Sequence, residues 1–134
     1  MPKQLNNNIK PVELLPIQAI EDSANGTGVD TYLADGSSFD TALIKAAIGD
    51  LGSQASTKVK IQESDVSDFS SGAQTAEGGD EVTVSADNTY SFQIKRAKRY
   101  LRAVVTLATP GETPSAEVHV DGILCNWDLP FPIL

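Results

Sequence analysis

The only histidine of the chain, His119, lies between two acids at a spacing that suggests metal chemistry. Glu117 and Asp121 stand two residues before and two residues after it, and imidazole and carboxylate groups are common zinc ligands. In a β-strand, however, residues four positions apart are separated by about 13 Å, so these three side chains cannot all bind one ion. The chain has no second histidine. We therefore predict no metal site and interpret this segment as the polar face of a strand.

Cys125 is the single cysteine, so it cannot form a disulfide bond within the chain. No histidine is adjacent to it in sequence, and we predict a small residue of the core or the edge rather than a catalytic thiol. The sequence contains no G-x-S-x-G motif, no Walker loop, no H-E-x-x-H motif and no EF-hand loop. We therefore predict a protein that is not an enzyme, with no catalytic residue and no cofactor.

Basic residues concentrate in the stretch "KRAKRYLR", residues 95–102. Five of the ten Lys and Arg residues lie there, although the net charge of the whole chain is −8. That net charge opposes general binding to nucleic acid or to an anionic membrane. A groove for single-stranded nucleic acid would also need exposed aromatic side chains among the basic ones, and the stretch contains only Tyr100. We therefore expect neither nucleic acid nor a membrane as the partner.

The position of the basic stretch, between two predicted strands, suggests a different use. It would form the turn and the rim of a hairpin, where its charges could set the register against acidic groups of a partner protein. The alternative is a turn that is merely solvated. The four residues that we predict to bind a partner here are Lys95, Arg96, Lys98 and Arg99.

Alternation of apolar and polar residues with a period of two predicts the strands that position these groups. It occurs in residues 56–64, 80–86, 88–96, 99–108 and 115–124, which are separated by turns rich in Asp, Gly, Asn, Ser and Pro. This spacing predicts an all-β fold, an antiparallel sandwich or barrel of about seven or eight strands. The residues expected in its core are Val59, Ile61, Phe92, Ile94, Leu101, Val105, Leu107, Val118 and Val120.

The segment "SFDTALIKAAIGDLG", residues 38–52, fits two structures. Ser38 could cap a helix that Gly49 or Gly52 would end. Alternatively, residues 40–49 form a strand that places Ile44 and Ile48 in the core. Local propensity slightly favours the helix, but an all-β order of the neighbouring segments favours the strand. We predict the strand.

The two ends differ in composition from the middle, which suggests one domain with two arms. We assign residues 1–36 to an N-terminal arm and lead-in, residues 37–125 to the sandwich and residues 126–134 to a C-terminal arm. Prolines bar the C-terminal segment "NWDLPFPIL" from a central strand, yet it is strongly apolar and should lie against another surface. We predict that four of its side chains bind a partner, namely Trp127, Leu129, Phe131 and Ile133; a weaker apolar set in the N-terminal arm is Val12, Leu14, Leu15 and Ile17.

Four stretches together resemble a known family. They are "KIQESDVSDFSSG" (residues 60–72), "IKRAKRYLRAVVTL" (94–107), "NGTGVDTY" (25–32) and the strand candidate "FDTALIKAAIGDLG" (39–52). As a set they resemble small structural proteins of tailed bacteriophages, the capsid decoration or cement proteins. The resemblance covers roughly residues 25–124 and excludes both ends of the chain. It implies a jelly-roll-like β-sandwich that sits on the outside of the phage head, commonly as a homotrimer.

The resemblance and the residues predict the same kind of protein. The partner would be the major capsid protein, and the protein would be located on the outer surface of the virion. We expect synthesis in the host cytoplasm, because no apolar run of signal-peptide length occurs near the N-terminus. The alternative is another virion part, either a head–tail connector or a tail or fibre component. A carbohydrate-binding virion module is less favoured, because it would need aromatic side chains exposed on a sheet face, and the chain has one Trp and three Tyr.

Overall fold

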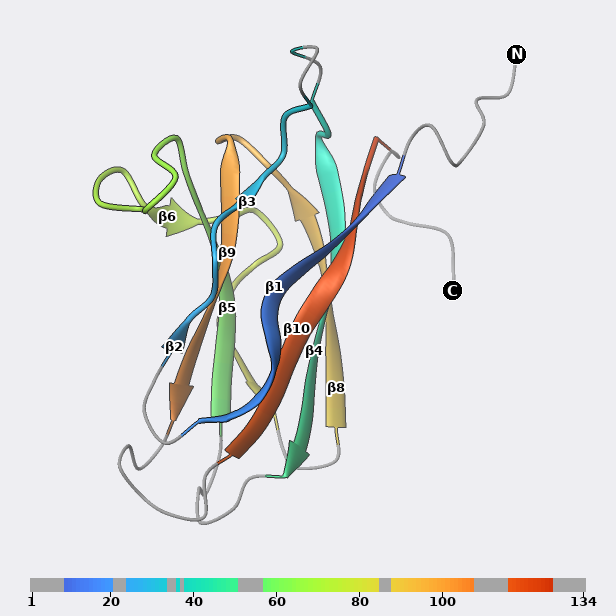
Figure 1. Cartoon of the computed structure of the whole chain (residues 1–134), viewed down its shortest axis with the longest axis vertical. Coiled ribbons are helices and arrows are strands. Elements are labelled where there is room, and N and C mark those ends of the chain that lie inside the picture. Colours follow the sequence, from blue (N-terminus) through green and yellow to red (C-terminus); the bar gives the residue numbers. More distant parts are fainter. Residues whose placement is uncertain are drawn as a thin grey trace.

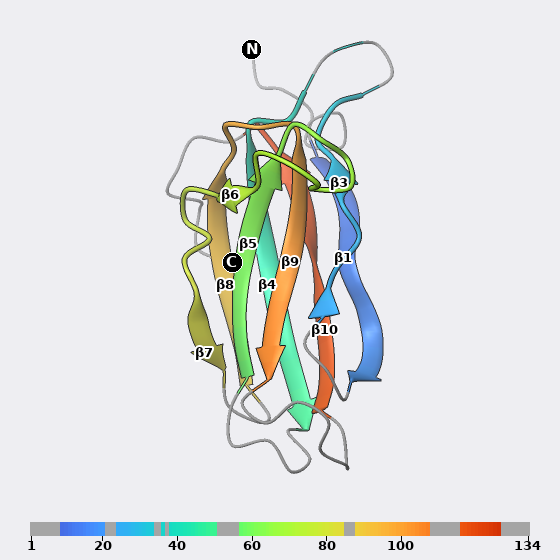
Figure 2. The same cartoon turned by 90° about the vertical axis from the view of Figure 1, so that its left-hand side faces the viewer.

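A computed structural model describes residues 9–20, 24–33, 36, 38–50, 57–84, 88–107 and 116–126 of the chain. The described part contains strands and their connections and no helix. Two antiparallel sheets pack face to face, as the two views of Figures 1 and 2 show. The predicted β-sandwich is confirmed.

The strands divide between the sheets as follows. A four-stranded sheet has the order β1-β10-β4-β8, and a six-stranded sheet has the order β2-β9-β5-β6, with β3 also paired to β9 and β7 also paired to β5. Their bounds are β1 Ile9–Ile20, β2 Ala24–Asn25, β3 Val29–Asp30, β4 Thr41–Asp50, β5 Thr57–Ser64, β6 Gln74–Thr75, β7 Val82–Val84, β8 Asn88–Lys95, β9 Tyr100–Leu107 and β10 Ala116–Cys125.

The pairing is nested, which is the mark of a jelly roll. The short strands β2 and β3 lie along β9, and β6 and β7 lie along β5, so each couple acts as one interrupted strand. The first strand, β1, then pairs with the last, β10, and the couple β2 and β3 pairs with β9. Further inward, β4 pairs with β8, and β5 pairs with the couple β6 and β7. Two sheets formed in this way by eight strands have the jelly-roll connection.

The core lies between the sheets and follows the alternation in the sequence. Every residue expected there is at most 3% exposed, and all belong to one cluster of buried apolar side chains. Successive residues of a strand face opposite sides. The side chains that face away from this core therefore form two outer faces.

The ambiguous segment is the central strand β4, so that prediction is confirmed. β4 pairs with β10 on one side and with β8 on the other. Ile44 and Ile48 are 0% and 2% exposed. Two neighbouring strands satisfy the backbone on both sides, and this tertiary pairing outweighs a slight local preference for helix.

The N-terminal boundary needs a correction, because the sandwich begins at residue 9 rather than at residue 37. β1 pairs with β10 from Ile9↔Cys125 to Ile20↔Ala116, and Leu14 and Leu15 are buried in the core. Pro11 and Pro16 of this segment lie in an edge strand, where a missing amide hydrogen is tolerated. Shifts in register between Glu13 and Leu15, and again before Gln18, mark irregularities in this edge.

Both sides of the sandwich are closed by backbone contacts between the sheets. On one side Thr27 N donates to Leu14 O at 3.0 Å, and on the other Lys95 N donates to Glu77 O at 3.1 Å. The contact between Lys95 and Glu77 requires a glycine at the next position, 78. Gly78 has a φ of +88°, and a Cβ there would lie 1.9 Å from Gln93 O. These contacts shield edges that could otherwise pair with other chains.

Candidate partner-binding surfaces

One end of the sandwich gathers the basic residues, and we call it the basic end. It consists of Lys95 at the end of β8, the turn 96–99 that leads to β9, and the neighbouring parts of residues 30–40 and 63–80. This turn lies at the upper end of the molecule in Figures 1 and 2. The sequence correctly places the basic stretch in a turn at one end of the sandwich, but the predicted hairpin is wrong. β8 pairs with β4 in the four-stranded sheet and β9 pairs with β5 in the six-stranded sheet, so this turn crosses from one sheet to the other.

A buried acid holds the turn of the basic end in place. Glu63, at the end of β5, is 1% exposed. Its Oε1 accepts hydrogen bonds from Ala97 N at 2.7 Å and from Lys98 N at 3.2 Å, and its Oε2 accepts one from Gln74 Nε2 at 2.8 Å. Such donors offset the cost of removing a carboxylate from water.

Glu63 was missed in the sequence analysis, although a signal for it exists. Val59 and Ile61 face the core, and Glu63 continues the same register two residues later. A charged residue in the inward register of a strand indicates a buried polar contact.

Arg99 is bound to Asp30 through two hydrogen bonds. Its Nε lies 2.9 Å from Asp30 Oδ1 and its Nη2 lies 2.8 Å from Oδ2. The hydrogen bond from Arg99 lowers the pKa of Asp30 below its ordinary value, and the same bond raises the pKa of Arg99. In addition, Arg99 N donates to Asp65 Oδ1 at 3.1 Å. The pair connects β9 to the end of β3.

Arg96 is also bound within the chain, to the residues that precede β4. Its side chain is 11% exposed. It donates to the carbonyl oxygen of Phe39 and, at 2.7 Å, to Ser38 Oγ. The Tyr32 ring stacks with both guanidinium groups, with its centroid 5.3 Å from Arg96 Cζ and 4.6 Å from Arg99 Cζ.

The two lysines of the predicted rim differ from each other. Lys98 Nζ donates to Gly72 O at 2.7 Å, whereas the side chain of Lys95 is exposed. Three of the four rim side chains thus have partners inside the chain. Lys95 is the rim residue best placed for an outside partner, and contact of the rim with acids of another protein stays a prediction.

The basic end also contains Asn126, the residue at which the C-terminal segment begins. Asp40 N donates to Asn126 Oδ1 at 2.8 Å, and Arg96 N donates to Asp40 O at 3.0 Å. The chain therefore leaves β10 beside the basic turn. The other predicted binding residues, Trp127, Leu129, Phe131 and Ile133, lie outside the described residues.

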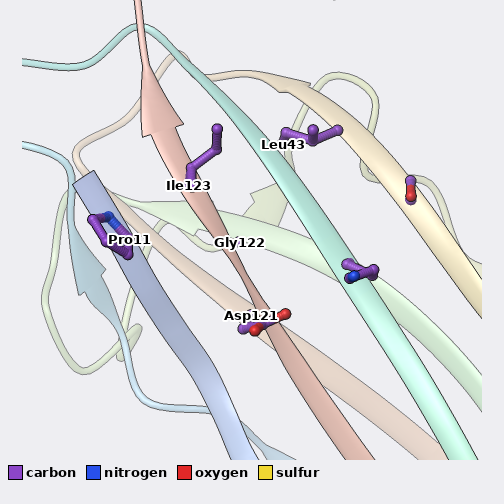
Figure 3. Close-up of a pocket in the computed structure, with 7 residues that line it drawn as sticks. Pro11, Leu43, Asp121, Gly122 and Ile123 are labelled. Atoms are coloured by element: carbon purple, nitrogen blue, oxygen red, sulfur yellow. The ribbon is translucent and has the colours of Figure 1, made fainter. Parts of the chain in front are cut away.

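The outer face of the four-stranded sheet carries a groove with a volume of about 490 Å³. Figure 3 shows Pro11 on β1, Ile123 on β10 and Leu43 on β4, three neighbouring strands. Gly122 lies between them, and its backbone packs closely: a Cβ there would lie 2.1 Å from Leu43 O. The full lining is Pro11, Leu43, Lys45, Ser91, Asp121, Gly122 and Ile123. The sequence alone does not predict this groove, because the groove depends on which strands are neighbours in the sheet.

His119 lies on the same outer face, near the groove. Its Nε2 is 3.1 Å from Glu13 Oε2 on β1 and 3.9 Å from Asp121 Oδ2. Glu13 is thus its nearer acid partner, and it comes from a strand far away in the sequence. Among the described residues, no three or more His, Cys, Asp and Glu side chains are arranged to hold a metal ion.

Cys125 is fully buried, as predicted for a small core or edge residue. Its Sγ lies 3.2 Å from Thr41 Oγ1, and the same hydroxyl donates to Cys125 O at 2.8 Å. This contact joins the end of β10 to the start of β4. It gives the cysteine a structural environment rather than an exposed, activated one.

Comparisons with known proteins add little. No protein-family model matches the sequence, and no curated protein matches it. Among solved structures, the crystal structure of PirA is similar at a TM-score of 0.46 and 15% sequence identity, over 89% of this chain and 94% of PirA. At this level of similarity, nothing about the present chain follows from PirA. Within the described residues, no helix is long and apolar enough to cross a membrane.

Proposed function

We propose that this chain is a decoration, or cement, protein of a tailed-bacteriophage head. It binds the outer surface of the major capsid protein, as a homotrimer, and stabilises the head. It acts through contact area and catalyses no reaction. The sequence resemblance over residues 25–124 supports this proposal, and the jelly-roll-like sandwich agrees with the fold that the resemblance implies.

The observation that carries the proposal is the meeting of two predicted binding elements at one end. Asp40 connects the basic turn to the start of the apolar C-terminal segment, because its backbone forms hydrogen bonds with both Arg96 and Asn126. A partner that covers this end would meet both elements at once. Burial of several large apolar side chains, with charges at the rim, is the usual composition of a specific interface.

The exposed apolar residues also indicate that the contact surface lies at the basic end. Three large hydrophobic side chains of the described part are exposed, and two of them, Tyr32 and Leu33, lie at the basic end. Tyr32 is already held by its two arginine neighbours, so little conformational freedom would be lost when a partner covers it. We infer that Tyr32, Leu33 and Lys95 form the described part of the contact surface.

The test uses heads of the phage that encodes the protein, prepared without it. Purified protein is added, the heads are sedimented, and bound protein is counted by quantitative mass spectrometry. The double variant Leu33→Ser with Lys95→Glu should lower occupancy at least tenfold. The matched control, Lys58→Glu on β5, changes another exposed lysine outside the basic end and should bind like the wild type.

The distribution of the protein on the particle distinguishes the proposal from its alternative. A cement protein covers the capsomers, and cryo-electron microscopy of the heads would show it repeated over the whole surface. A connector would form one ring at the portal vertex. Density at that vertex alone, or wild-type binding by the double variant, would contradict the proposal.

A further inference from the structure

The groove on the outer face of the four-stranded sheet has the properties of a docking site for the end of this same chain. We propose that, in the isolated protein, residues 127–134 turn back and lie in the groove formed by Pro11, Leu43 and Ile123. The inference concerns the isolated chain and goes beyond the proposed capsid role, which it does not require.

The first observation is that the groove is apolar and lies on a face that no described strand covers. Its walls are the partly exposed side chains of Pro11, Leu43 and Ile123, from three adjacent strands. The polar groups lie around them, with Lys45, Ser91 and Asp121 in the next row of the sheet. Such a concave apolar surface gains stability when another apolar segment removes it from water.

The second observation is that the two middle residues of the adjoining row of the same face, Cys125 and Thr41, are buried. Cys125 and Thr41 face away from the core, because their neighbours Leu124 and Ala42 face into it. Nevertheless Cys125 is 0% exposed and Thr41 is 7% exposed, and neither belongs to the core cluster. At these two positions, beside the point where the chain leaves β10, the outer face is therefore shielded from solvent.

The third observation is that the C-terminal segment begins within reach of the groove. β10 ends at Cys125, and Asn126 is held beside Asp40. Ile123 lies about 10 Å back along the strand from Asn126. The eight residues 127–134 can span about 26 Å when extended, which leaves enough length for a reversal and a run across the groove.

The composition of the segment fits such a surface. Its large apolar residues, Trp127, Leu129, Phe131 and Ile133, alternate with other residues. Pro130 and Pro132 lack amide hydrogens and favour an extended chain, so the segment can lie on a face without joining a sheet. Docking on its own chain also benefits from a high effective concentration, which a second molecule would not have.

The experiment uses Trp127, the only tryptophan of the chain, as its probe in the full-length protein. If the segment lies in the groove, Trp127 fluorescence is blue-shifted and protected from acrylamide. Leu43→Gln and Ile123→Gln should each shift the emission to the red and raise the quenching constant at least twofold. Val104→Gln is the matched control, because Val104 is a partly exposed apolar residue on the outer face of the other sheet.

Two further measurements complete the test. Phe131→Ser and Ile133→Ser change the segment and leave the sheet untouched, so they should raise quenching even if a groove variant fails to fold. The protection should also be independent of protein concentration. The proposal is overturned if wild-type Trp127 is quenched like a free indole, if groove variants and segment variants match the control, or if dilution removes the protection, which would place the segment on another copy.

Discussion

The basic end and the outer face of the four-stranded sheet differ in how completely their side chains are satisfied. At the basic end, Arg96, Arg99 and Lys98 donate to groups of the same chain, and Glu63 accepts three hydrogen bonds. On the outer face, the apolar side chains of Leu43 and Ile123 line a groove, and no described strand lies over them.

This difference shows that a cluster of charges in a sequence is weak evidence of a binding site. The arginines of the basic end join three segments that are distant in sequence, and their first effect is to hold those segments together. A site for an outside partner is better indicated by groups that the fold leaves exposed. At the basic end these groups are Lys95, Tyr32 and Leu33.

The largest expected effect distinguishes the two sides of β4. Ile44→Ala removes a side chain that is 0% exposed and should lower the free energy of unfolding by about 2–5 kcal/mol. Leu43→Ala, on the neighbouring outward residue, should cost less than about 1 kcal/mol. Urea denaturation followed by circular dichroism measures both. Equal losses would show that the outer face is packed as tightly as the core.

Two glutamates test the comparison with the same chemical change. Glu63→Ala leaves the amide hydrogens of Ala97 and Lys98 without their acceptor and should destabilise the protein by about 2–4 kcal/mol. Glu13→Ala, on the outer face, removes an acid whose side chain is 54% exposed and should cost less than about 0.5 kcal/mol. The unfolding midpoints in urea give both values. A small effect at Glu63 would mean that the turn 96–99 has other sufficient support.

Two basic residues provide a third test, of intermediate size. Arg96→Ala removes the donors to Phe39 O and Ser38 Oγ from a side chain that is 11% exposed and should cost about 1–2 kcal/mol. Lys45→Ala, on the exposed outer face, should change stability by less than about 0.5 kcal/mol. Thermal unfolding of both variants makes the comparison. Near-wild-type stability of the Arg96 variant would show that the fold does not need the contacts of this side chain, which would then be available to bind a partner.

The smallest effect concerns the Asp30–Arg99 pair and depends on pH. The pKa of Asp30 is lowered from its ordinary value of 3.8, so the pair stabilises the fold fully above that pH. The contribution is lost as the pH falls from 3.8 through the lowered pKa. Asp30→Asn should therefore be less stable than the wild type at pH 7, and the gap in stability should close as the pH falls from 3.8 through the lowered pKa of Asp30. A gap that is unchanged between these conditions would show that the carboxylate charge contributes nothing.

The sequence determined the parts of the fold that depend on local alternation. A period of two places Val59, Phe92, Val105 and Val118 in the core wherever the strands are paired, because successive side chains of a strand face opposite sides. The position of the basic stretch in a turn between two strands could be predicted in the same way, but the sequence did not show that these strands belong to different sheets. The composition of residues 1–36, in contrast, suggested an arm, because the sequence does not say that residues 9–20 pair with β10 at the edge of a sheet.

Only the tertiary structure decided which distant residues meet. Asp30 and Arg99, Glu63 and Ala97, and His119 and Glu13 are brought together by pairing between strands. The same pairing assembles the groove from β1, β10 and β4. Alternation fixes which face of its own strand a residue occupies, but the neighbour of that strand is set by the burial of the whole core, to which many segments contribute at once.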